Sequence, residues 1–142
     1  MYRLKDVAMI TGLTERTLRT YLRLGILKGK KEGRVWHFDM DELTDFLGHE
    51  AVKSAMESNR NTLVFDFLND SFADDDMACV ILHLEKGKSM KTANFFCDAV
   101  NKREGVKMRF DTLRGTNQVI LVGKVDTVDA IVEEYQNLGE QK

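Results

Sequence analysis

The segment of residues 4–24 contains two short stretches of helical periodicity with a glycine between them. In the first stretch, the positions that repeat at i, i+3, i+4 and i+7 are Leu4, Val7, Ala8 and Thr11. This spacing predicts a helix over residues 4–11 with one buried face. Gly12 follows where a helix C-cap favours a left-handed residue, and the hydroxyl of Thr14 can cap a second helix. The chain is therefore predicted to begin as two helices joined by a tight turn.

The second predicted helix, residues 15–24, has two faces of opposite chemistry and is ended by Gly25. At 100° per residue, its apolar stripe consists of Leu18, Tyr21 and Leu22. Its outward face consists of Arg16, Thr20 and Arg23, with Thr17 and Arg19 on the flanks. A helix pair whose second helix is basic is the geometry that places a recognition helix in the major groove of DNA. The arginines can pair with guanine edges or bind phosphates, and the spacing does not divide them between these roles.

Residues 26–38 form a basic, turn-rich segment with the sequence ILKGKKEGRVWHF. Its tip favours a turn and residues 35–38 favour a strand, so we predict two short strands that form a wing. The cations of this wing are Lys28, Lys30, Lys31 and Arg34. They would bind phosphates beside the groove, whereas the alternative is a solvated loop. Trp36 is expected to fill the core beneath the wing rather than to stack on a base.

A third helix is predicted after the wing. Asp39 or Asp41 can cap its N-terminus. Its expected buried stripe consists of Met40, Leu43, Phe46 and Leu47. Its outer face is acidic and consists of Asp41, Glu42 and Asp45. We therefore expect this helix to point away from phosphates and to complete a winged helix-turn-helix domain over residues 1–48.

The charges of the chain are distributed unevenly, although its net charge is only -2. Residues 1–37 contain nine Lys and Arg against three Asp and Glu, for a net charge of +6. Residues 38–61 and residues 62–142 each have a net charge of -4. A basic head joined to an acidic remainder predicts a polyanion-binding domain attached to a domain with another task.

The rest of the chain is predicted to be a short helical linker, residues 49–61, and an α/β domain, residues 62–142. The predicted strands are residues 63–68, 78–84, 106–113 and 119–122. The predicted helices are residues 89–104 and a final helix that Asp126 caps. Their predicted apolar stripes are Met90, Ala93, Phe96, Cys97 and Val100 in the first, and Val128, Ile131, Val132, Tyr135 and Leu138 in the second. The order ββαββα predicts an α+β fold related to the ferredoxin-like sandwich, with two helices on one face of a four-stranded, mainly antiparallel sheet. The apolar run at 78–84 is expected to be a central strand, and the second sheet face to be open to a partner or ligand.

Several other sequence features could indicate a binding or catalytic site, but for each of them a purely structural role is preferred. Gly87-Lys88-Ser89 would need an upstream glycine at Leu82 to be a P-loop. Asp74 to Asp76 lack the spaced ligands of a calcium loop, and His83 is read as a sheet histidine. Cys79 and Cys97 can meet across a strand and a helix, but buried, inert thiols are preferred. We therefore predict no catalytic residues, metal site or cofactor, and no enzyme activity.

The stretch GLTERTLRTYLRLGIL resembles the start of the MerR family of transcription regulators. The matching positions are Gly12, Thr14, Arg16, Thr17, Leu18, Arg19, Tyr21, Gly25 and Leu27. The stretch GRVWHFDMDELTDFL is more similar to the related excisionase-type winged helix. The resemblance implies base and phosphate contacts from the second helix and the wing. The candidate DNA-binding residues are Thr14, Arg16, Thr17, Arg19, Thr20, Tyr21, Arg23, Lys28, Lys30, Lys31 and Arg34.

Two departures from the family pattern shape the functional expectation. Thr20 precedes Tyr21 where the family often has a tyrosine pair, and residues 49–61 are too short for the long dimerising coiled coil. We therefore expect a homodimer formed through residues 62–142, in a cytoplasmic regulator that binds double-stranded DNA, because the sequence has neither a signal peptide nor an apolar run that could span a membrane. Alternatives are an excisionase-like factor that bends DNA, a protein-interaction module that no longer binds DNA, and a regulator whose sheet face binds a small-molecule effector.

Overall fold

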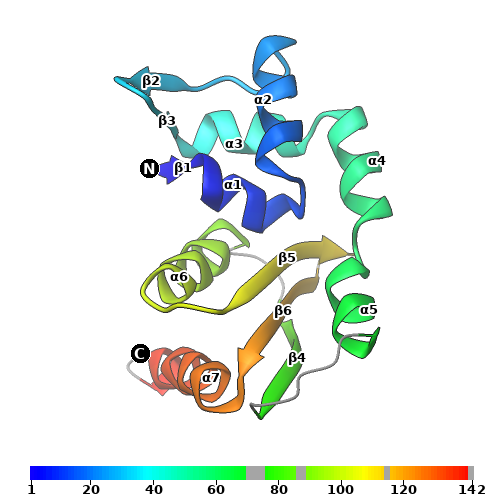
Figure 1. Ribbon diagram of the computed structural model, residues 1–142. Coiled ribbons are helices and arrows are strands. Elements are labelled where there is room, and N and C mark those ends of the chain that lie inside the picture. Colours follow the sequence, from blue (N-terminus) through cyan, green and yellow to red (C-terminus); the bar gives the residue numbers. More distant parts are fainter. Residues whose placement is uncertain (70–75, 86–88, 114–115, 141–142) are drawn as a thin grey trace. The chain divides into compact units, whose positions relative to one another are not determined.

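The computed structural model in Figure 1 describes residues 1–69, 76–85, 89–113 and 116–140. The chain divides into two units, Met1–Arg60 and Asn61–Lys142. Each unit is described separately below. The residues expected in the acidic loop at 70–75, the P-loop-like residues Gly87 and Lys88, and the turn residues Arg114 and Gly115 lie outside the described residues.

The first unit contains four helices and a small sheet. Its elements are β1 (Tyr2–Arg3), α1 (Leu4–Thr11), α2 (Glu15–Arg23), β2 (Lys30–Glu32), β3 (Val35–Phe38), α3 (Met40–Leu47) and α4 (Glu50–Ser58). The two helices predicted at residues 4–24 are confirmed, and the strand predicted at 35–38 is β3. Residues 49–61, predicted as a helical linker, contain α4, which belongs to this unit.

The sheet of the first unit has the order β1-β3-β2 and is antiparallel throughout. β2 and β3 form a hairpin whose turn is Gly33 and Arg34, so Lys30 and Lys31 lie on a strand rather than at the tip. β1 is not predicted by the sequence pattern; its residues Tyr2 and Arg3 pair with Phe38 and His37. This third strand fixes the start of the chain against the hairpin.

The core of the first unit lies between α1, α2, α3 and the inner side of β3. Its fully buried side chains include Val7, Ile10, Leu18, Leu27, Phe38, Leu43, Phe46 and Val52. The prediction that Met40 belongs to the buried stripe of α3 was wrong, since its side chain is 49% exposed. Met40 is the first residue of α3, one turn before Leu43, and therefore lies beyond the edge of the core.

Asp39, one of the two predicted caps, begins α3 through a capping box. The backbone N–H of Glu42 donates to Oδ1 of Asp39 at 2.7 Å. The backbone N–H of Asp39 donates in return to Oε1 of Glu42 at 3.0 Å. This reciprocal pair satisfies backbone donors that the first turn of a helix otherwise leaves free, and it sets where the hairpin ends and α3 begins.

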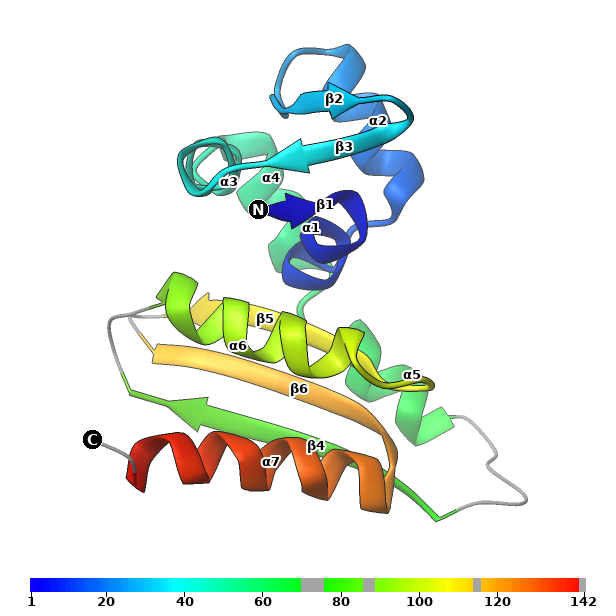
Figure 2. The same cartoon turned by 90° about the vertical axis from the view of Figure 1, so that its left-hand side faces the viewer.

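The second unit is a three-stranded sheet with helices on both faces. Its elements are α5 (Thr62–Asn69), β4 (Met77–Leu84), α6 (Ser89–Asn101), β5 (Lys107–Leu113), β6 (Thr116–Lys124) and α7 (Val125–Glu140). The strands are antiparallel in the order β4-β6-β5. Figures 1 and 2 show α6 and α7 on one face of this sheet and α5 on the other.

The prediction of a strand at residues 63–68 was wrong, because this segment is α5. The order ββαββα and the four-stranded sheet that depended on it are therefore also wrong for the described residues. A run of six mostly apolar residues does not by itself distinguish a strand from one side of a short helix. The sheet face that was expected to be open carries α5 instead.

The prediction that residues 78–84 form a central strand was also wrong, since β4 is an edge strand and β6 is central. Both faces of β6 are buried, as successive residues 119–122 show. In β4, by contrast, the side chain of Ile81 is 47% exposed. A continuous apolar run is typical of a strand buried on both faces, but here it belongs to the strand at one end of the described sheet.

The helices α6 and α7 pack together over the sheet as the periodicity predicted. The residues of the predicted stripes that are buried are Ala93, Phe96, Cys97, Val100, Val128 and Ile131. Tyr135 stacks on Phe96 with 5.1 Å between ring centroids, and Arg103 after α6 pairs with Glu134 of α7. Leu138, expected in the stripe of α7, is exposed near the end of the helix. Among the residues that the structure describes, no helix has the length and apolarity needed to span a bilayer.

Candidate nucleic-acid interface

The turn between α1 and α2 is held by local hydrogen bonds. Gly12 has φ 73° and its N–H donates to the carbonyl of Ala8 at 2.8 Å, which ends α1. The hydroxyl of Thr14 accepts from the N–H of Thr17 at 3.1 Å, which begins α2. Thr11, buried behind the turn, donates its hydroxyl to Val7 and accepts from Leu13. The direction of α2 is therefore set by the residues that the sequence pattern identified.

The outward face of α2 carries three arginines. Arg16, Arg19 and Arg23 are exposed, whereas Leu18 on the opposite side is fully buried. Nη2 of Arg23 donates to the hydroxyl of Thr20 at 3.2 Å, and this hydroxyl donates to the carbonyl of Arg16. Of the predicted outward face, Arg16 and Arg23 are exposed, whereas Thr20 is half-buried and holds the guanidinium of Arg23 against the helix.

Tyr21 has a structural role within the same helix. Its half-buried ring contacts Phe46 of α3 edge-on, with 5.6 Å between the ring centroids. Its carbonyl accepts from the N–H groups of Ile26 and Leu27. Leu22, the third residue of the predicted apolar stripe, is half-buried. Packing on α3 therefore fixes the rotation of α2 and keeps its arginines outward.

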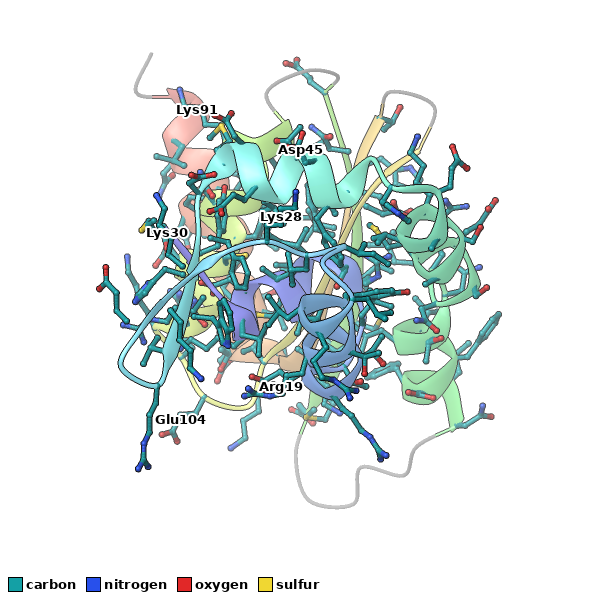
Figure 3. The ribbon with its side chains drawn as sticks, turned by 90° about the horizontal axis from the view of Figure 1, so that it is seen from above. Arg19, Lys28, Lys30, Asp45, Lys91 and Glu104 are labelled. Carbon is teal, nitrogen blue, oxygen red and sulfur yellow. The ribbon has the colours of Figure 1, made fainter. Side chains whose placement is uncertain are left out.

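The hairpin places its cations on different sides. Paired residues of an antiparallel ladder share a face, so Lys31 lies on the face of Trp36 and Phe38, and Lys30 on the face of His37. Nζ of Lys31 lies 5.7 Å from the ring centroid of Trp36, within range of a cation–π interaction. Arg34 is exposed in the turn. Figure 3 shows Arg19 on α2, Lys28 on the segment before β2, and Lys30 on β2.

Two basic residues that the sequence analysis did not single out lie beside Lys30. His37 pairs with Lys30 on one side and with Arg3 of β1 on the other. The three side chains therefore form a row across the sheet, with neighbouring Cβ atoms about 5 Å apart. Arg3 and Lys30 are exposed and His37 is half-buried. We call this set the Arg3–His37–Lys30 row; only the pairing of β1 with β3 reveals it.

Acidic side chains are few on the basic elements and more numerous on α3. Glu15 on α2 and Glu32 on β2 are exposed, and α3 carries three acidic residues. Asp41 and Asp45 are exposed there, and Asp45 is labelled in Figure 3. Glu42 is half-buried because it takes part in the capping box. α2 carries three arginines against Glu15, and residues 28–38 carry four Lys and Arg against Glu32. Both surfaces therefore have a net positive charge, which a phosphate backbone would favour.

The residues of the second unit that were weighed for chemistry and that the structure describes include His83, Cys79 and Cys97. His83 is exposed on β4, whereas Cys97 is buried on α6. Burial raises the pKa of the Cys79 thiol above its ordinary value, which keeps it protonated at neutral pH. Within the described ranges, no three His, Cys, Asp or Glu side chains are arranged to hold a metal ion.

Comparison with known proteins gives one match. Residues 2–52 match the family described as MerR HTH family regulatory protein. Comparisons with curated proteins and with solved structures gave no significant match. The matched range begins in β1, ends in α4 and includes α2 and the hairpin. Residues 2–52 are therefore a MerR-like helix-turn-helix segment, which indicates a DNA-binding transcriptional regulator.

Proposed function

We propose that the chain is a homodimeric regulator that binds a specific duplex sequence, with α2 in the major groove and the β2–β3 hairpin as a wing on the neighbouring backbone. The observation that carries this proposal is the face of α2, which presents Arg16, Arg19 and Arg23 to solvent while Leu18 is buried behind it. A helix with this division can enter the groove without losing its own packing.

The roles within the interface are divided by position. Arg16, Thr17 and Arg19 lie in the first half of α2, the part of a recognition helix that reaches base edges. Thr14, Thr20, Tyr21 and Arg23 would contact phosphates and fix the register of the helix. Lys28, Lys30, Lys31 and Arg34 would supply the salt-dependent share of the affinity from the wing.

A homodimer fits a recognition helix as short as α2. Each subunit would read one half-site, and the second unit would join two chains so that the half-sites lie about 34 Å, or a multiple of it, apart. The second unit has a net charge of -4 over residues 62–142. DNA phosphates would repel this charge, which favours a position for the second unit away from the duplex.

Selection of bound duplexes from a random DNA library is the most direct test. We expect the full chain to enrich an inverted repeat, because a symmetric dimer imposes its twofold axis on the site. An enriched single half-site would contradict the dimer but keep DNA binding. A pool without any enriched sequence would contradict specific recognition.

The Arg3–His37–Lys30 row should contribute phosphate contacts that depend on salt rather than on sequence. Replacing Arg3 with alanine is expected to weaken binding to all duplexes by a similar factor and to reduce the slope of log K against log salt by about 0.9. Lys5→Ala removes the same charge from an exposed position of α1 and serves as the control. If the slope of log K against log salt is the same for Arg3→Ala and Lys5→Ala, the Arg3–His37–Lys30 row does not contact DNA.

A further inference from the structure

We propose that the outer edge of β4 pairs antiparallel with the β4 of a second copy of this chain, which would make one six-stranded sheet from two second units. This proposal deepens the homodimer of the proposed function by assigning its surface, and its test uses no DNA. It rests on four observations: the edge of the sheet, the composition of β4, the exposed side chain at the middle of β4, and the side of α7 beside that edge.

The first observation is the free edge. All eight residues of β4 pair with β6 along one side, from Met77 opposite Lys124 to Leu84 opposite Asn117. Among the strands that the structure describes, none pairs with the other side of β4. Eight residues present about 26 Å of backbone N–H and C=O groups for a further strand.

The second observation is that the sequence and pairing of β4 lack the features that protect an edge strand. Proteins block free edges with lysines, prolines, bulges or very short strands. The sequence MACVILHL has no Asp, Glu, Lys, Arg, Pro or Gly, and its pairing with β6 has no bulge. A neutral strand can lie against an identical strand without opposing like charges, which favours a second copy over a charged partner.

The third observation concerns the side chains of β4 that the fold leaves uncovered. Ile81 at the middle of the strand is 47% exposed and lies on the same face of the sheet as Ile120, its partner in the ladder. Pairing at the edge would shield the side chain of Ile81 from water, which adds to the apolar area that two copies bury.

The fourth observation is the chemistry of α7 next to the edge. α7 packs on β4 and β6, and Glu134 points toward α6 because it pairs with Arg103. At 100° per residue, the opposite side of α7 carries Val125, Val132, Asp129 and Gln136. This side faces past β4, and it carries two half-buried valines and one carboxylate. Two such helices can therefore lie side by side across a β4–β4 junction with little repulsion.

Symmetry restricts the register. A twofold axis perpendicular to the sheet keeps α6 and α7 of both copies on one face, and it requires paired residues to have numbers of the same parity. The pairing can then be centred on Val80, with Cys79 opposite Ile81 of the partner subunit, or on Ile81 itself. Both registers are neutral along the strand, and they can be told apart chemically.

The test compares the association of three forms of the full chain by sedimentation or light scattering. The native chain is expected to be a dimer, and Ile81→Lys is expected to weaken dimerisation at least tenfold, because two ammonium groups would meet near the axis. Glu104→Gln makes the same change in charge at an exposed residue after α6 and should leave the dimer intact. Circular dichroism reports whether each variant is folded.

A disulfide cross-link tests the pairing of β4 with a second β4 even if Ile81→Lys does not fold. Ile81→Cys, with Cys79 kept, should form an intermolecular disulfide on mild oxidation, joining residue 81 to residue 81 or to residue 79 according to the register. Disulfides need Cα atoms about 4.4–6.8 Å apart, which opposed strand residues satisfy. A monomeric native chain, or a dimer that Ile81→Lys leaves unchanged and Ile81→Cys does not cross-link, would overturn the proposal. Either result leaves the binding of α2 to DNA to be judged by its own variants.

Discussion

Replacing Arg16 and Arg19 together with alanine is expected to lower affinity for the selected duplex at least about 30-fold. An arginine paired with a base edge contributes about 1–3 kcal/mol, so two contribute about 2–6 kcal/mol, and 1.4 kcal/mol is a factor of ten. Both side chains are exposed, so the free energy of unfolding should change by less than about 0.5 kcal/mol. Fluorescence anisotropy at fixed salt measures the first effect, and thermal melting measures the second.

A matched control separates contact from charge. Lys53→Ala with Lys102→Ala also removes two positive charges, from exposed positions outside α2 and the hairpin. This pair should change affinity only through the weak, screened field of the whole protein. If the control weakens binding as much as the arginine pair does, α2 is not the reading element.

The Gly29→Ala variant is expected to destabilise the first unit by as much as about 3 kcal/mol, the upper end for overpacking of a well-packed core. A Cβ at this position would lie 2.4 Å from Cε1 of Phe38 and 2.9 Å from the carbonyl oxygen of His37. Phe38 is fully buried and the carbonyl belongs to β3, so neither can move away without disturbing the sheet. Urea unfolding of Gly29→Ala and of the control variant Gly48→Ala measures the difference in their free energies of unfolding.

Gly48→Ala provides the comparison for Gly29→Ala. Gly48 caps α3 with φ -81°, and a Cβ there would meet its nearest neighbours at 3.6 Å, an ordinary van der Waals distance. This variant should be neutral or slightly stabilising, because alanine restricts the unfolded chain. Equal midpoints for the two variants would show that the approach of Gly29 to Phe38 is relaxed in solution.

The sequence was sufficient for the first unit where local chemistry dominates. Gly12, Thr14 and the stripe at Leu18 identified α2 correctly, because each acts through neighbours within four residues along the chain. The pairing of Arg3 with His37 joins positions 34 residues apart in the sequence. A strand of two residues is too short to show the alternating pattern by which strands are predicted. The candidate interface was therefore predictable along α2 and incomplete at the sheet.

In the second unit the errors have one physical origin. The apolar content of a segment predicts that its side chains are buried. It does not predict whether the segment is a helix or a strand, or which element packs against it. Residues 62–69 and residues 77–84 are both apolar, yet one is a helix over a sheet face and the other is an edge strand. Only tertiary pairing separates the two outcomes, whereas the long periodic stripes of α6 and α7 needed no such information.

The pairing of β1 with β3 has a practical consequence for work with the purified protein. Tyr2 is buried and Arg3 is directly opposite His37, so any sequence fused ahead of Met1 emerges beside the hairpin. A polyhistidine tag there would place partly protonated imidazoles next to the surface whose salt response is to be measured, and these would add phosphate contacts of their own. Tags for binding assays are therefore better attached at the C-terminal end of the chain.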